Sequence, residues 1–104
     1  MAWFFLAVAG VFEIIWAIGL KYSNGFTRLW PTALTLTAML FSFGFLAQAL
    51  RTIPVGTGYA VWTGIGAVGT ATLGIILFAE PVTWARIGCI LLIVTGILGL
   101  KLVS

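Results

Sequence analysis

Residues Ala2 to Leu20 read AWFFLAVAGVFEIIWAIGL, an apolar run that is interrupted by a single acid, Glu13. Nineteen residues are enough to cross a bilayer as a helix, because a rise of about 1.5 Å per residue gives a length of roughly 30 Å. Glu13 falls near the middle of this run and therefore near the membrane midplane. A central acid costs about 3 kcal/mol to insert unless it faces water, a partner or a ligand, so Glu13 indicates a functional site.

The composition of the whole chain is that of an all-α integral membrane protein. Of its 104 residues, 62% are hydrophobic and only 7% are charged. Four apolar stretches predict spanning helices, which together form a single transmembrane domain over residues 1–104. We expect these helices at residues 2–20, 29–50, 57–78 and 83–101.

The same composition argues against several classes of protein. There is no His, and the single cysteine, Cys89, supports neither a disulfide nor a metal site. The net charge of +3 is scattered, which argues against nucleic-acid binding. No nucleophile motif or phosphate loop is present, so we expect neither an enzyme nor a cofactor.

The Lys and Arg residues divide almost equally between the two membrane faces. With four spans, one face carries three of them and the other carries two: Lys21, Arg28 and Arg86 against Arg51 and Lys101. This near balance sets no orientation, so we expect dual topology, with copies inserted both ways up. Four helices are too few to enclose a solute path, and opposite insertion allows an antiparallel homodimer that brings two Glu13 carboxylates close together.

The last helix offers small residues for packing, at Gly88, Thr95, Gly96 and Gly99. Small residues let membrane helices approach closely. They are suited equally to pairing with a second copy and to packing on their own subunit.

Helical spacing names the neighbours of Glu13. Gly10 and Trp16, three residues before and after it, share its face. Ser42 lies at a similar depth on the second helix, where its hydroxyl can bond either a carboxylate or the carbonyl four residues before it. Met39 and Phe43 flank Ser42 and suit either a binding slot or a lipid-facing surface.

The third helix carries a stripe of polar, aromatic and small residues at helical spacing: Tyr59, Trp62, Thr63, Gly66 and Thr70. Hydroxyl and π groups on one face are suited to a binding site. The alternative is that Tyr59 and Trp62 are interfacial anchors, since both lie within two turns of the helix start.

Three segments closely resemble the small multidrug resistance family, and in particular its guanidinium-exporter subtype. They are GVFEIIWA at residues 10–17, KYSNGFT at 21–27 and PVGTGYAVWTGIGA at 54–67. The resemblance implies an antiparallel dimer in the inner (plasma) membrane, with Glu13 as the ligand for proton and substrate. It also implies a surrounding shell of Trp16, Ser42, Tyr59 and Trp62. Met39 and Phe43, by resemblance, and Gly10 and Thr63, by helical spacing, are weaker lining candidates.

These features predict a proton-coupled antiporter that exports guanidinium and small guanidinyl cations, driven by the proton gradient. Two carboxylates at low dielectric repel each other and should titrate as a coupled pair. A planar guanidinium can displace their protons through charge-assisted hydrogen bonds, aided by cation–π contacts. The alternatives are a quaternary-ammonium multidrug/proton antiporter of the same family and, from another class, a small pore-forming oligomer, which would leave the midplane acid unexplained.

Overall fold

The apolar runs form four helices in the computed structural model, which describes residues 1–103. These are α1 (Ala2–Tyr22), α2 (Leu29–Ala49), α3 (Val55–Phe78) and α4 (Trp84–Val103). Each is long and apolar enough to cross a membrane. The prediction of an all-helical fold with four helices able to span a membrane is therefore confirmed for residues 1–103.

The helix ends differ slightly from those expected from hydropathy, and local chemistry accounts for two of the differences. Pro54 is the N-cap of α3, and its ring fixes φ near the observed −55°. The helix therefore begins at Val55. The Thr83 hydroxyl accepts the backbone N–H of Arg86 at 3.1 Å, a capping bond that starts α4 at Trp84. The turn after α1 has positive φ at two successive residues, 50° at Asn24 and 72° at Gly25.

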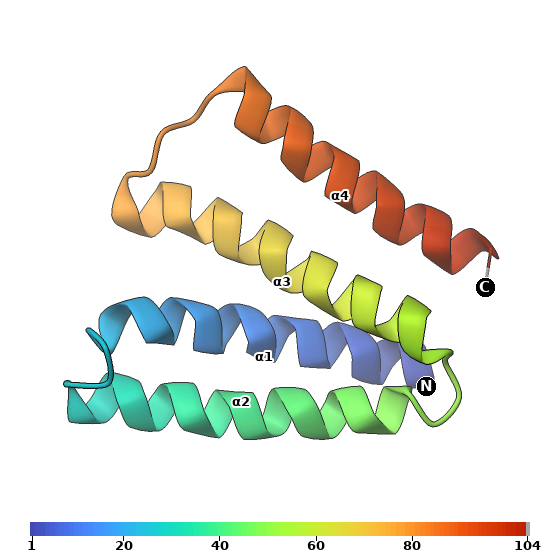
Figure 1. The fold of residues 1–104 in the computed structure, drawn as a ribbon, viewed down its shortest axis with the longest axis horizontal. Helices are drawn as coiled ribbons and strands as arrows, with labels where there is room; N and C mark the ends of the chain where they lie inside the picture. The colour runs from blue at the N-terminus through green and yellow to red at the C-terminus, as the bar shows by residue number, and fades with distance from the viewer. Residues whose placement is uncertain (104) are drawn as a thin grey trace.

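The helices form a layer little more than one helix thick. The order across it is α2, α1, α3, α4, and both termini lie at the same end (Figure 1). The molecule measures 41 × 34 × 17 Å, so its shortest dimension is less than twice the diameter of a helix with its side chains, about 10–12 Å. α1 is therefore flanked by α2 and α3.

Glycines set the close contacts of α1 with its two neighbours. A Cβ on Gly10 would lie 2.5 Å from Cγ2 of Ile65 on α3, and one on Gly19 would collide with the Thr35 hydroxyl on α2. Only glycine fits at these points, as is common where membrane helices pack closely.

α4 is the outlying helix. None of its described residues is buried, and it diverges from α3 toward the 79–83 link (Figure 1). Its contact with α3 centres on Gly64, where a Cβ would lie 2.8 Å from Cδ1 of Ile97. By contrast, nothing within residues 1–103 comes within 4 Å of a Cβ at Gly88, Gly96 or Gly99. The alternative that these three glycines pack on their own subunit is therefore wrong, because their faces are open.

Replacement of Gly10 by alanine tests the close contact between α1 and α3. Gly10→Ala should lower the free energy of unfolding by about 1–3 kcal/mol, because Ile65 must move to admit the new methyl group. Gly44→Ala on α2 is the matched control, since its Cβ would meet nothing within 4 Å. It should be neutral or stabilising by up to about 1 kcal/mol. Denaturant titration in detergent micelles, followed by tryptophan fluorescence, measures both; equal effects would contradict the packing.

Candidate functional site

Glu13 lies near the middle of α1, and its side chain extends toward α3. Its side chain rests directly on Gly66, where a Cβ would collide with Oε1 of the carboxylate. This oxygen is buried and has no hydrogen-bond partner among residues 1–103. A buried carboxylate oxygen without a donor needs either a proton of its own or a cation beside it. The contact with Gly66 therefore holds the Glu13 carboxylate where it can bind either a proton or a cation.

Ser42 ties three helices together next to this acid. Its hydroxyl donates to the backbone carbonyl of Ala9 on α1 at 2.7 Å and accepts the indole N–H of Trp62 on α3 at 3.0 Å. Ser42 is completely buried, and Trp62 is 6% exposed. Because Ala9 lies one helical turn before Glu13, this bonded chain fixes α2 and α3 about 5.4 Å along the axis from the level of the acid.

The observed bonds revise two sequence-based expectations. In this structure the Ser42 hydroxyl bonds neither a carboxylate nor the carbonyl of Ala38, four residues before it; the donor bond goes to α1. Trp62 is buried, so the alternative that it is an interfacial anchor is wrong. No sequence pattern marks Ala9 as a partner, because its contribution is a backbone carbonyl.

Four aromatic side chains form a continuous row across the three helices, which we call the aromatic row. Ring centroids are 6.4 Å apart from Trp16 to Phe43, 5.8 Å from Phe43 to Trp62 and 5.6 Å from Trp62 to Tyr59. Tyr59 is 57% exposed and Phe43 44% exposed. The row therefore runs from beside Glu13 to the surface of the layer and offers π faces along its length.

Trp16 contributes a second unpaired polar atom. Its indole Nε1 is buried and has no hydrogen-bond partner among the described residues. Trp16 follows Glu13 by one turn of α1, so an unpartnered donor and an unpartnered acceptor lie close together on one helix. Two buried polar atoms without hydrogen-bond partners, one turn apart on a helix, are typical of a site that a ligand or another chain completes.

The weaker candidates have mixed roles. Gly10 packs against Ile65, which makes it a helix contact. Phe43 belongs to the aromatic row, and Met39 is half-buried on α2. Thr63 is exposed on α3. Within residues 1–103 there is no group of three or more His, Cys, Asp or Glu that could hold a metal ion.

Comparison with known proteins identifies relatives over the full length of the chain. A family model described as Small Multidrug Resistance protein matches residues 1–93. The chain is 60% identical over 104 residues to a protein of Yersinia pestis named guanidinium exporter, with all of both chains covered. Proteins of the same name from Proteus vulgaris, 55% identical with all of both chains covered, and Citrobacter freundii, 57% identical over 98% of this chain and 97% of that one, are also similar.

The hydrogen bond from Trp62 to Ser42 can be tested by a double-mutant cycle. Ser42→Ala leaves the buried indole N–H without an acceptor and should lower the free energy of unfolding by about 1–3 kcal/mol. In a Trp62→Phe background, Ser42→Ala should lower the free energy of unfolding by a smaller amount. The difference between the two backgrounds should be about 0.6–1.7 kcal/mol. Denaturant titration in micelles measures both.

The control for this cycle is Thr72→Ala, which removes an exposed hydroxyl that bonds the Val68 carbonyl of its own helix at 2.8 Å. It should change stability by no more than about 0.5 kcal/mol. If Ser42→Ala had the same cost in both backgrounds, Trp62 would not depend on Ser42.

Proposed function

Since the chain belongs to the Small Multidrug Resistance family, we propose that it exports guanidinium and small guanidinyl cations in exchange for protons, as a multi-pass membrane transporter rather than an enzyme. One observation carries the proposal: the Glu13 carboxylate is seated on Gly66 with a buried oxygen that lacks a partner. It lies at mid-length of a membrane-spanning helix, where an unpaired acid is unfavourable. Both a proton and a cation would relieve it, and they cannot do so at the same time.

The groups around Glu13 favour a flat cation with N–H donors. A carboxylate accepts two parallel hydrogen bonds from a guanidinium edge. The Ser42 hydroxyl already donates once and accepts once, so one of its two lone pairs is left for a further N–H. The faces of Trp16, Trp62 and Tyr59 supply cation–π attraction, worth about 2 kcal/mol or more where water is excluded.

The proton and the substrate compete for the same oxygens. When the carboxylate is protonated it loses the charge that attracts a cation, and when a guanidinium occupies it the proton is displaced. Binding of one therefore releases the other, which couples outward movement of substrate to inward movement of protons. No cofactor is needed in this scheme, because the proton gradient supplies the free energy.

An antiparallel homodimer completes the proposed site. Large apolar side chains of α1 remain exposed, among them Phe4 and Val11, and three glycines on α4 are open to a neighbour. The near-equal division of Lys and Arg between the two faces supports insertion in both orientations. A second copy, inverted, would cover Glu13 and the aromatic row and bring a second carboxylate to the same depth.

The second candidate is export of quaternary ammonium cations, which the exposed part of the aromatic row favours, because aromatic faces bind methylated ammonium groups well. Such cations lack N–H groups. They would leave the acceptors on Glu13 and Ser42 unpaired, and sites built for hydrogen bonding discriminate strongly against such ligands. The hydrogen-bonding groups therefore favour guanidinium.

Replacing Glu13 with glutamine should abolish exchange. Glu13→Gln keeps the size of the side chain but can neither bind a proton nor attract a cation, so guanidinium-driven proton movement in proteoliposomes should fall to the level of protein-free vesicles. Cys89→Ala changes an exposed residue of α4 and should retain the wild-type rate. Persistent exchange by Glu13→Gln would show that another group carries the coupling.

Binding should weaken as the solution becomes more acidic. Protons occupy the carboxylate at low pH, so the apparent Kd for guanidinium should rise as pH falls, by up to about tenfold per pH unit for each proton displaced. Calorimetric titration of purified protein measures this. Tetramethylammonium, tested alongside, should bind more weakly than guanidinium at every pH. Tighter binding of tetramethylammonium would favour the quaternary-ammonium alternative, and a pH-independent Kd would exclude proton competition.

A further inference from the structure

A second carboxylate lies along α3 from the Glu13 site. α3 ends at Phe78, and Ala79 turns into the left-handed region with φ of 53°, which directs the chain back so that Glu80 lies against the end of the helix. A Cβ on Gly74 would lie 2.6 Å from Oε1 of Glu80. Glu80 is thus seated on a glycine of α3 as Glu13 is, and the two glycines, Gly66 and Gly74, are separated by about 12 Å along the helix axis.

A cavity of about 320 Å³ between α1 and α3 lies beside this second carboxylate. On α1 it is lined by Ala17 and Lys21, one and two turns beyond Glu13. On α3 it is lined by Thr70 and Gly74, one and two turns beyond Gly66, and Glu80 also lines it. A water molecule takes up about 30 Å³ in the liquid, so the cavity has room for a small cation with several waters.

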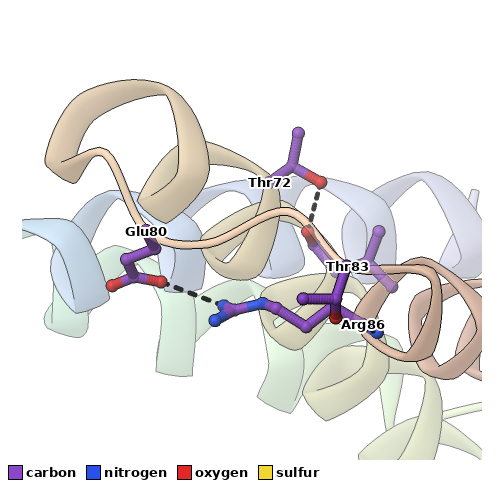
Figure 2. Close-up of polar contacts among 5 residues, drawn as sticks. Thr72, Glu80, Thr83 and Arg86 are labelled. Carbon is purple, nitrogen blue, oxygen red and sulfur yellow. Dashed lines mark hydrogen bonds and ion pairs between the residues drawn. The ribbon is translucent and has the colours of Figure 1, made fainter.

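The Glu80 carboxylate is already paired with a guanidinium group, that of Arg86. Nη2 of Arg86 lies 3.0 Å from Oε1 of the carboxylate (Figure 2). The contact is partly exposed, at 38% for the Arg86 side chain and 42% for that of Glu80. Ion pairs this exposed change an equilibrium by less than about fivefold. A competing cation in solution can therefore displace Arg86.

The mouth of the cavity holds another cation. The Lys21 ammonium lies 5.8 Å from the centroid of the Phe78 ring, over its face. Both of the cation-attracting groups at this end of the cavity, a carboxylate and an aromatic face, are thus occupied by cations of the chain itself. This end of the cavity is suited to binding cations.

We propose that Glu80 is an outer binding station for guanidinium-class cations, which pass along the α1–α3 seam between it and Glu13, and that the Arg86 side chain occupies this station when no substrate is present. The inference rests on the proposed function. Arg86 carries the same planar N–H-bearing head group as the substrate, so exchange replaces one guanidinium on Glu80 by another. No net charge is left behind on the carboxylate at either stage of the exchange.

A purely structural ion pair would have different consequences. In that case the bond would only hold the 79–83 link against the start of α4, where Thr83 also caps the helix (Figure 2). Removing either partner would then break the same contact and change transport in the same direction. As a binding station, Glu80 and its competitor Arg86 have opposite effects on substrate.

The test is the KM for guanidinium in proteoliposome exchange assays. Glu80→Gln removes the outer carboxylate and should raise KM about threefold, whereas Arg86→Gln frees the carboxylate and should lower KM about threefold, both with little change in kcat. Shifts of KM in the same direction, or no shift in either variant, would overturn the station.

A second measurement follows Arg86 in the wild-type chain, so it does not depend on whether a variant folds. Guanidinium chloride, but not sodium chloride of equal ionic strength, should move the NMR signal of the Arg86 Nε–H group toward its position in Glu80→Gln. The same response should persist in Glu13→Gln, which lacks the inner site. A wild-type chain that exchanges no guanidinium would overturn the proposed function and the station with it. Exchange with an unmoved Arg86 signal would overturn the station alone.

Discussion

The contact between Glu13 and Gly66 is the constraint on which the rest of the structure depends. A carboxylate within apolar helices is tolerated where it faces the protein interior, water, a partner or a ligand rather than lipid. Gly66 permits this contact because it has no side chain. Gly10 on the same face of α1 lets α3 come equally near one turn earlier. The close packing of α1 on α3 is therefore a condition for holding the acid as well as a source of stability.

The sequence predicted the helices themselves better than it predicted which helices pack against one another. Length and hydropathy were sufficient for four spanning helices, and helical spacing placed Glu13 at mid-depth with Gly10 and Trp16 on its face. The order α2, α1, α3, α4 could not be obtained in this way. These helices are apolar on every side, so no amphipathic stripe distinguishes the faces that touch protein from those that touch lipid.

Individual contacts in the site were also beyond the reach of sequence patterns. Ser42 was a reasonable candidate because of its depth, but its donor bond goes to the carbonyl of Ala9, and any residue type supplies a carbonyl. The burial of Trp62 follows from that bond network, since its distance from the helix start suits an interfacial residue equally well. Glu80 is paired with Arg86 across the link between α3 and α4.

The bonded chain from Ala9 through Ser42 to Trp62 has a mechanical consequence. It crosses α1, α2 and α3 at one level, in surroundings where no water replaces a broken bond. Sliding of α2 or α3 along α1 would break one of these bonds, whereas tilting about this level would keep both. The two bonds therefore resist sliding of the three helices along one another more than tilting about the level of Ala9.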